Sequence, residues 1–426
     1  MNILVIGNGG REHAIIWKLK QSPRVDKIYC TIGNAGICSI AECINIKPED
    51  ITGLINFAKA NKIDFTVVGP EVPLAMGVVD KFISEGLKVF GPAKNAAMLE
   101  TSKTFAKEFM QRYNIPSAQF RKFNLEQKNE AAEYLSAIKY PVVIKADGLA
   151  AGKGVIISED KHSAEKAIKE IFEDKIFGNA GNSIVIEDFL TGSEASVFAI
   201  CDGTDYLVLP PAQDHKKILN GEKGKNTGGM GSFAPADKIV TDDVMKKIRE
   251  RVIEPVLDNM KKEGNEFKGC LYCGLMINEN NDPFVIEFNT RLGDPETQVV
   301  LPKIESDFLE MLLASAEGNI KNYNLKINNN YYCSVVLASN GYPDKYESGK
   351  EITGLDNIND NCIIFHAGTK CENGKILSSG GRVLNVVGVS NNNLKYAIDN
   401  AYSNLALINF ENKYYRTDIA QKGLIK

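Results

Sequence analysis

Residues 285–296 read VIEFNTRLGDPE, an apolar run that continues into a polar one. Because side chains alternate along a strand, Glu287 and Asn289 should share one face, while Ile286 and Phe288 should face the other way. A carboxylate and an amide oxygen on one face are hard oxygen ligands. The pattern therefore predicts a site for Mg²⁺ or Mn²⁺ bridging nucleotide phosphates.

Arg291 continues the same face of this predicted strand. Its guanidinium can hold a carboxylate or a phosphoryl group during transfer. The alternative is a half-exposed strand with an ordinary polar face. The strongly apolar opposite face favours the metal site over that alternative.

A second motif, KADGLAAGKGV at residues 145–155, links two expected strands at 142–145 and 155–157. It is not a Walker A loop, because no Ser or Thr follows its Gly-Lys pair. Its glycines would let the backbone approach an anion closely, and its two lysines supply charge. We expect a flap over nucleotide phosphates; an ordinary exposed hairpin is the alternative.

The first hundred residues alternate strand-like and helix-like segments, which predicts an open α/β sheet of Rossmann-like type. The expected strands are 3–6, 25–30, 65–68 and 88–90, and 11–21 is an expected helix. The turn at 7–13 reads GNGGREH, and Glu12 occupies the third glycine position of the dinucleotide fingerprint. A phosphate-binding turn and a merely tight turn both remain open.

The chain changes character after the first hundred residues. Strand-rich, glycine-punctuated regions are followed by a long helical stretch and two strands, and a polar run at 326–330 is a plausible junction. The last part again combines strands with one helix. The expected elements are strands in 141–157, 184–209, 272–277, 284–288, 333–338 and 383–389, and helices at 242–262 and 394–407.

Two weaker signals lie between these motifs. The strand VIEDFL at 185–190 ends in acidic residues and is followed by Glu194. Such a strand can present a backbone edge to adenine and a carboxylate to ribose, although acidic residues at strand ends are usually just solvated. The glycine-rich loop at 226–231 could shape a small-substrate pocket.

Composition bounds the class of protein. A chain of 426 residues predicts two to four domains, and a formal net charge of −4 argues against broad nucleic-acid binding. No apolar run is long enough for a membrane span, and the N-terminus lacks the pattern of a signal peptide. The nine cysteines fit reduced thiols better than a disulfide framework. The pair Cys270 and Cys273 is expected in a core strand instead of a redox or zinc site.

Taken in order, these motifs resemble the ATP-grasp superfamily, and within it the phosphoribosylamine–glycine ligase family. The resemblance covers essentially the whole chain. It implies a Rossmann-like N-terminal domain at 1–102, an ATP-grasp domain at 103–318 with a small mobile lid at about 120–190, and a small α+β C-terminal domain at 319–426. The most specific segments are 7–14, 68–71, 145–154, 226–231, 286–298, 366–369 and 380–383.

The resemblance also implies an activity. The family joins glycine to 5-phosphoribosylamine and splits ATP to ADP and phosphate through glycyl phosphate, the second step of de novo purine biosynthesis. We accordingly expect ATP, glycine and 5-phosphoribosylamine as substrates and Mg²⁺ or Mn²⁺ as the metal. We expect a cytoplasmic monomer or weak dimer without nucleic-acid or membrane partners.

Site residues are carried over from the family position by position. ATP would be held by Lys103, Lys145, Gly148, Gly152, Lys153, Gly154, Glu187, Leu190 and Glu194, and the metal by Glu287 and Asn289. Asp214 and Arg291 would hold glycine and the reacting phosphoryl group, and Gly9, Gly10 and Arg382 the phosphate of phosphoribosylamine.

Three alternatives compete with this interpretation. A biotin carboxylase-like enzyme shares the Glu-x-Asn-x-Arg pattern but would carry a Glu-His pair soon after the arginine, where this chain has Pro295. An NAD-dependent oxidoreductase would need a glycine in place of Glu12. A non-catalytic nucleotide-binding regulator would not need an intact metal strand with both lysines.

Overall fold

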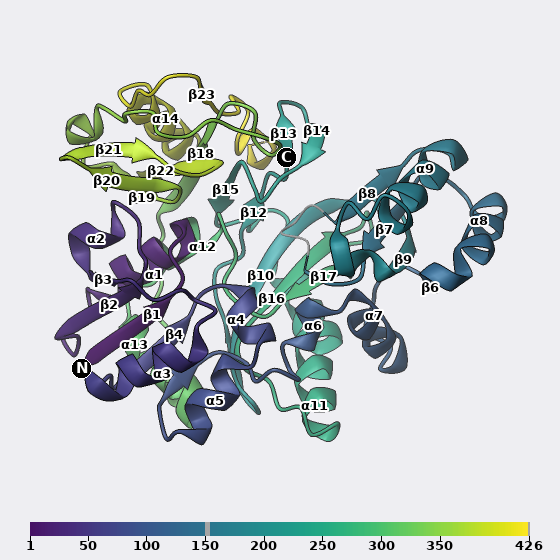
Figure 1. Ribbon diagram of the computed structural model, residues 1–426, viewed down its shortest axis with the longest axis horizontal. Helices are drawn as coiled ribbons and strands as arrows, with labels where there is room; N and C mark the ends of the chain where they lie inside the picture. The colour runs from purple at the N-terminus through teal and green to yellow at the C-terminus, as the bar shows by residue number, and fades with distance from the viewer. Residues whose placement is uncertain (150–153, 425–426) are drawn as a thin grey trace.

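Figure 1 shows the computed structural model, which describes residues 1–149 and 154–424. The N-terminal part is a parallel sheet in the order β3-β2-β1-β4-β5, as the Rossmann-like expectation predicts. Leu4 and Ile6 pack into one core cluster and Ile3 and Val5 into another, so β1 is buried on both faces. The elements are β1 Asn2–Ile6, α1 Gly10–Leu19, β2 Lys27–Thr31, α2 Ile37–Ile40, β3 Glu42–Ile44, α3 Ile51–Ala60, β4 Phe65–Val68, α4 Glu71–Ala75, α5 Val78–Ser84 and β5 Val89–Phe90.

The strand order of this sheet reverses between β1 and β4. The loops that follow these two strands leave the same carboxyl edge, which is where open α/β sheets bind ligands. The turn at 7–10 and Glu71, the first residue of α4, lie at this edge. The N-terminal domain therefore presents its loops to the rest of the chain.

An antiparallel sheet, β11-β10-β16-β17, forms the centre of the molecule. Helices α10 and α11 and the π-helical turn between them pack on one face, and α13 packs on the other. The strands are β10 Ser193–Asp202, β11 Tyr206–Val208, β16 Lys268–Ile277 and β17 Pro283–Asn289. The helices are α6 Met98–Thr101, α7 Lys103–Arg112, α10 Asp242–Ile248, the π-helix Arg249–Ile253, α11 Glu254–Lys262, α12 Thr297–Val300 and α13 Phe308–Glu317.

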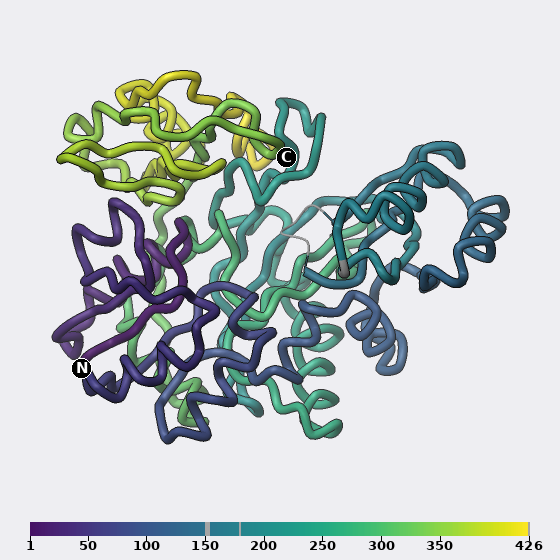
Figure 2. The backbone as a smooth tube through the Cα atoms, in the orientation of Figure 1, coloured from purple at the N-terminus to yellow at the C-terminus, as the bar shows by residue number. Residues whose placement is uncertain are grey.

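A smaller antiparallel sheet, β6-β9-β7-β8, stands to one side of the rest (Figure 2). Helices α8 and α9 cover one of its faces. The expected hairpin across residues 145–155 is confirmed, because β7 pairs antiparallel with β8. This unit falls within the predicted lid, whose mobility stays a prediction. Its elements are β6 Phe120–Asn124, α8 Lys128–Ala137, β7 Val142–Ala146, β8 Val155–Ser158, α9 Lys161–Phe172 and β9 Ser183–Asp188.

The C-terminal sheet has the order β12-β15-β18-β22-β19, with β23 paired to β18. Two of its strands, β12 and β15, come from the middle of the chain, so the sheet crosses the predicted boundary at 318, which remains a prediction. Helix α14 packs on this sheet, and two hairpins project from it (Figure 1). The elements are β12 Gln213–Asp214, β13 Lys217–Leu219, β14 Lys223–Asn226, β15 Gly231–Ala234, β18 Tyr331–Ser339, β19 Cys362–His366, β20 Thr369–Glu372, β21 Lys375–Ser378, β22 Arg382–Ser390, α14 Leu394–Leu405 and β23 Lys413–Tyr414.

The cysteines follow the sheet geometry with one exception. Cys270 and Cys273 are buried in β16 and pack into opposite core clusters, because an odd spacing on a strand sends side chains to opposite faces. The expectation of reduced thiols is wrong for Cys38 and Cys43, which form a disulfide between α2 and β3. Their Cα atoms are 5.5 Å apart, within the range that a disulfide bridges.

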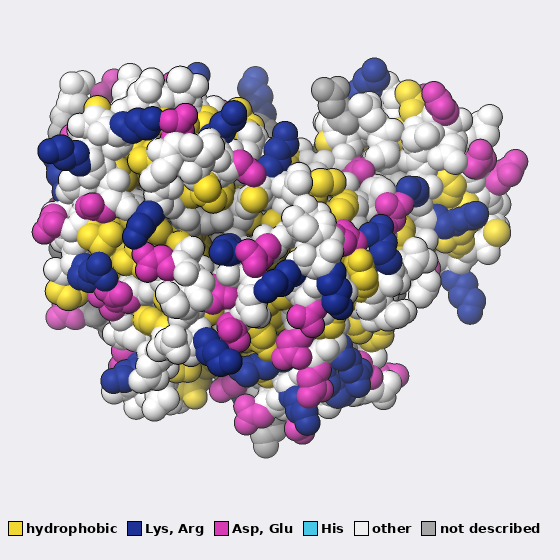
Figure 3. Space-filling model, turned by 90° about the horizontal axis from the view of Figure 1, so that it is seen from below, with side chains coloured by type: hydrophobic (Ala, Val, Ile, Leu, Met, Phe, Trp, Pro, Cys, Tyr) yellow, Lys and Arg dark blue, Asp and Glu magenta, His cyan; other side chains and the backbone are white. Residues whose placement is uncertain are grey.

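The surface is mixed in charge. On the face that Figure 3 shows, Lys and Arg side chains alternate with Asp and Glu side chains without forming a large field of one sign. No helix in the described ranges has the length and apolarity needed to cross a bilayer.

Candidate active site

One cavity of about 1680 Å³ lies between the small sheet, the central sheet and the C-terminal sheet. Most of the predicted site residues line it, although they come from distant parts of the sequence. Gly9 and Gly10 are not among the lining residues, and Gly152 and Lys153 lie outside the described residues. The predicted residues in the lining are Lys103, Lys145, Gly148, Gly154, Glu187, Leu190, Glu194, Asp214, Glu287, Asn289, Arg291 and Arg382.

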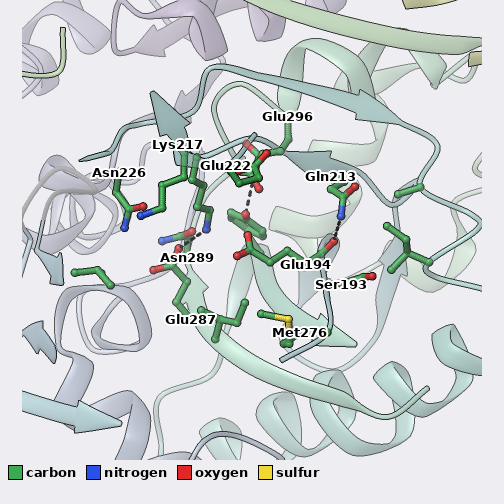
Figure 4. A pocket seen from close by; sticks show the side chains of 18 of the residues that line it. Ser193, Glu194, Gln213, Lys217, Glu222, Asn226, Met276, Glu287, Asn289 and Glu296 are labelled. Carbon is green, nitrogen blue, oxygen red and sulfur yellow. Dashed lines mark hydrogen bonds and ion pairs between the residues drawn. The ribbon is translucent and has the colours of Figure 1, made fainter. Parts of the chain in front are cut away.

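The predicted metal ligands lie within the last three residues of β17. Glu287 and Asn289 lie side by side at the wall of the cavity (Figure 4). Burial opposes ionisation of Glu287, but Lys216, Lys103 and Lys145 hold its pKa down at about 2. The carboxylate is thus ionised at neutral pH, as a metal ligand must be.

The predicted alternation along this strand fails at Ile286. Gly274 pairs with Glu287 and Leu275 with Val285, so Ile286 is the extra residue of a β-bulge. Val285 consequently takes the core position, and Ile286 lines the cavity instead of facing away from it. Phe288 is buried on the opposite face, as predicted.

Strand β16 pairs with β17, the strand that carries the predicted metal ligands and is called the metal strand below, and places Gly274 opposite Glu287. A Cβ atom added to Gly274 would lie 3.3 Å from Glu287 Cγ, so the glycine leaves room for the Glu287 side chain. No group of three or more His, Cys, Asp or Glu side chains in the described part of the chain is arranged to hold a metal. Glu287 and Asn289 therefore remain the candidate pair.

Arg291 is held by two carboxylates from the N-terminal part of the chain. Its Nε lies 3.2 Å from Glu71 Oε2, and its Nη2 lies 2.9 Å from Glu100 Oε1. Burial disfavours its charge, but the two glutamates outweigh burial and raise the pKa of Arg291. Glu71 also faces Arg11, with 3.9 Å between Arg11 Nη1 and Glu71 Oε2.

A second charged group joins the small sheet to the central sheet. Lys145 Nζ lies 3.0 Å from Glu187 Oε1 and donates to the carbonyl of Ile286 at 2.8 Å. Lys107 Nζ lies 2.9 Å from the other carboxylate oxygen of Glu187. Burial lowers the pKa of Lys107, and Glu187 partly offsets that effect. Sequence reasoning missed Lys107, although its i,i+4 spacing from Lys103 on α7 places both on one helix face.

Acidic residues gather around Lys216 on the side of the cavity away from the small sheet. Lys216 Nζ donates to Glu287 Oε1 at 3.4 Å, and Tyr272 donates to Glu296 Oε1 at 2.8 Å. Burial followed by repulsion from Asp214 raises the pKa of Glu296 to about 7. Burial alone would lower the pKa of Lys216, but Asp214 and Glu287 raise it well above its ordinary value.

Burial also raises the pKa of Glu194, which lies on β10 of the same central sheet as Glu287 (Figure 4). Nearby Lys216 acts in the opposite direction on this carboxyl, and Asp214 acts in the same direction as burial. Sequence reasoning gave Lys216 and Glu296 no role, because the sequence around each residue does not show that both line the same cavity.

Arg382 joins two loops at the cavity. Its Nη1 donates to the carbonyl oxygens of Gly228 at 2.6 Å and Asp294 at 2.9 Å, and it lies 3.3 Å from Asp294 Oδ1. Burial lowers the pKa of Arg382, but Asp294 outweighs burial and raises it. The guanidinium therefore links the glycine-rich loop at 226–231 to the segment that follows the metal strand.

The turn at the start of α1 is packed against other side chains. Gly9 N–H donates to Glu12 Oε2 at 2.6 Å, and Arg11 N–H donates to Asp294 Oδ2 at 3.4 Å. A Cβ atom on Gly10 would lie 2.6 Å from the Asn385 amide nitrogen, so close packing requires glycine there. Arg11 is the residue of this turn that reaches the cavity.

Family comparisons cover the three parts of the chain. The description "Phosphoribosylglycinamide synthetase, N domain" matches residues 1–100, the "ATP-grasp (A) domain" of the same family matches 101–297, and its "C domain" matches 332–422. ATP-grasp enzymes use ATP with a divalent metal. The ATP-grasp match contains both the small sheet and the central sheet, between the N-terminal parallel sheet and most of the C-terminal sheet.

Individual relatives agree with the family match. The chain is 48% identical to a phosphoribosylamine–glycine ligase of Caldanaerobacter subterraneus subsp. tengcongensis over 420 residues, 99% of each chain. The structure of the present chain is similar to the crystal structure of phosphoribosylamine–glycine ligase from Thermotoga maritima. The TM-score is 0.85 and the sequence identity 35%, over 98% of this chain and all of that one.

A biotin carboxylase from Campylobacter jejuni has a TM-score of 0.73 at only 18% identity, covering 97% of this chain and 92% of that one, so it shares the fold alone. The fold, the order of the cavity residues along the sequence and the full-length match all indicate one family. The chain belongs to the phosphoribosylglycinamide synthetase family.

Proposed function

We propose that the protein is an ATP-dependent ligase that joins glycine to 5-phosphoribosylamine, giving glycinamide ribonucleotide, ADP and phosphate. This is the second step of de novo purine biosynthesis, and we place it in the cytoplasm. The observation that carries the proposal is one cavity whose lining combines three sets of side chains. These are the lysines Lys103 and Lys145, the β17 residues Glu287 and Asn289, and the acidic residues Asp214 and Glu296 near Lys216. The full-length identity to phosphoribosylamine–glycine ligases supports the choice of substrates.

We assign ATP to the side of the cavity formed by the small sheet. Lys103 and Lys145 would contact its phosphates, and the loop that carries Gly148 and Gly154, together with Gly152 and Lys153, would cover them. Glu187 and the Leu190 backbone would meet adenine, and Glu194 the ribose. The presence of the described members of this set in one cavity lining supports the assignment.

Glu287 and Asn289 are the residues that would hold Mg²⁺ or Mn²⁺. Their donor atoms fit such an ion, because one is an ionised carboxylate and the other an amide oxygen. A divalent ion bound there would neutralise phosphate charge during transfer. Lys216 would add positive charge beside the same carboxylate.

Asp214 and Arg291 are proposed to hold glycine and the reacting phosphoryl group. The ammonium group of glycine would face the acidic residues near Lys216, which include Asp214, and its carboxylate would face Arg291. A carboxylate oxygen of glycine attacks the γ-phosphorus, the bond from that phosphorus to ADP breaks, and glycyl phosphate forms. The amine of phosphoribosylamine then attacks the glycyl carbonyl, phosphate leaves, and the new amide loses one proton.

This chemistry needs positioning and charge neutralisation more than a protein nucleophile. Three arginines and several lysines in the cavity lining can supply that charge. Gly9, Gly10 and Arg382 are proposed for the phosphate of phosphoribosylamine, and the position of Arg382 in the lining supports its share. A monomer or weak dimer without nucleic-acid or membrane partners stays a prediction.

The test is a substrate-omission assay. The protein is incubated with ATP, Mg²⁺, glycine and freshly made phosphoribosylamine, and ADP and the amide product are measured together. We expect both products only when glycine and phosphoribosylamine are present. ADP release driven by bicarbonate, or consumption of a nicotinamide cofactor, would contradict the proposal.

A further inference from the structure

Glu100, a buried residue on α6, contacts three consecutive residues at the end of the metal strand. Its carboxylate accepts hydrogen bonds from Asn289 Nδ2 at 3.1 Å, from Thr290 N–H at 2.7 Å and from Thr290 Oγ1 at 3.1 Å. It also forms the 2.9 Å ion pair with Arg291. Only 2% of Glu100 is exposed, so these contacts replace water around its charge.

The contact with Asn289 determines which end of that side-chain amide faces the cavity. A carboxylate paired with arginine can only accept hydrogen bonds, so Asn289 must turn its NH₂ group towards Glu100. The amide oxygen is then the end left for a cation at the cavity wall, where Asn289 lies beside Glu287 (Figure 4). An asparagine turned the other way would present hydrogen atoms to a cation.

We propose that Glu100 is the positioning residue that orients Asn289 as an oxygen ligand and, with its other contacts, holds Arg291 towards the reacting group. The inference rests on the proposed function, because it presumes that Glu287 and Asn289 receive a divalent ion. Glu100 itself does not touch the ion. It acts on the metal through Asn289, as residues that orient metal ligands do.

The first test measures metal binding without turnover. Mn²⁺ binding is followed by electron paramagnetic resonance in the presence of ADP, for the wild type and for Glu100→Gln. Glutamine places an NH₂ group where a carboxylate oxygen met Asn289, so the Asn289 amide should reverse and lose its oxygen contact with the ion. We expect Mn²⁺ affinity to fall by roughly 10- to 100-fold, the range for residues that orient metal ligands.

A double variant separates orientation from general damage. Asn289→Asp offers an oxygen at either end of the side chain, and a glutamine at position 100 can donate to it. The N289D change should therefore raise Mn²⁺ affinity more on the E100Q background than in the wild type, where two carboxylates would face each other. Turnover of the double variant should stay low, because Arg291 has lost its ion pair with Glu100.

Two controls accompany these variants. Glu263→Gln is matched, because Glu263 accepts from Tyr113 Oη at 2.8 Å and pairs with Arg112 away from the cavity; its Mn²⁺ affinity should equal that of the wild type. Glu100→Asp keeps the charge but shortens the side chain, and it should retain more affinity than E100Q. It also serves if E100Q fails to show a cooperative thermal melt.

The outcomes are distinguishable. Wild-type Mn²⁺ affinity in folded E100Q, or equal effects of N289D on both backgrounds, would overturn the role of Glu100 and leave the proposed function standing. Failure of the wild type to bind Mn²⁺ with ADP would overturn both the metal site and this inference. Loss in E100Q with recovery in the double variant would support it.

Discussion

Replacing Glu287 with glutamine removes the one carboxylate that the metal strand offers, while the side chain keeps its size. Val285 and Phe288 supply the buried face of β17, so the core packing should persist. The variant loses the 3.4 Å contact with Lys216, which retains Asp214 nearby. The low pKa of Glu287 sets an upper limit of about 3 kcal/mol on the stability lost with its charge, and the partial exposure of both partners reduces the expected fall in the free energy of unfolding to about 1 kcal/mol.

The catalytic effect should be much larger. Glu287 has a pKa of about 2 and is therefore fully charged at neutral pH, so glutamine removes a whole negative charge from the proposed ligand set. A metal that stabilises the transferring phosphoryl group contributes several kcal/mol. A loss of about 4 kcal/mol would lower kcat by about a thousandfold.

The assay pairs a thermal melt with ADP release across a titration of Mg²⁺ and of Mn²⁺. We expect a nearly unchanged melting temperature, a large loss of kcat, and partial recovery at high metal concentration, since the amide oxygen still coordinates weakly. A folded variant that turns over at the wild-type rate would remove Glu287 from the metal site.

Three further variants test other parts of the site. Arg382→Ala should lower kcat/KM for phosphoribosylamine by about 10- to 100-fold, the cost of a lost charged hydrogen bond, and leave the KM for ATP unchanged. A variant in which only the KM for ATP rises would show that Arg382 does not belong to the phosphoribosylamine site. Lys107→Met should raise the KM for ATP by about tenfold, because Glu187, which is assigned to adenine, would then pair with Lys145 but no longer with Lys107. An unchanged KM for ATP would exclude a role of Lys107 in ATP binding. Burial raises the pKa of Glu71, but Arg291 and Arg11 outweigh burial and lower it to about 2 from 4.5. The stability this carboxylate contributes, up to about 3 kcal/mol, is present above pH 4.5 and lost as the pH falls towards 2, so urea unfolding of wild type and Glu71→Gln should converge in acid.

Local patterns in the sequence were enough for much of the fold. The apolar runs of the N-terminal part became the parallel sheet because strands buried on both faces need continuous apolar sequence. The hairpin at 145–155 and the strand at 283–289 were likewise predictable, since each pattern is local. The ATP-side residues came from the family resemblance, and all of those in the described ranges line one cavity.

Contacts between distant segments were not predictable in the same way. Glu100 meets Asn289 across 189 positions of sequence, and nothing near Glu100 indicates that partner. The bulge that turns Ile286 into the cavity depends on the register with β16, which a single strand does not reveal. The turn at 7–13 likewise does not reveal that Gly10 packs against Asn385 of the C-terminal sheet, and the role of this turn in phosphate binding stays a proposal.

The most direct test of the account is the dependence of ADP formation on both acceptors. With ATP and Mg²⁺ held constant, glycine and freshly made phosphoribosylamine are each omitted and restored, and ADP and the amide product are measured in the same samples. We predict that the two products appear together in equal amounts, and only when both acceptors are present. ADP formed at the full rate without glycine or without phosphoribosylamine, with no amide product, would contradict it.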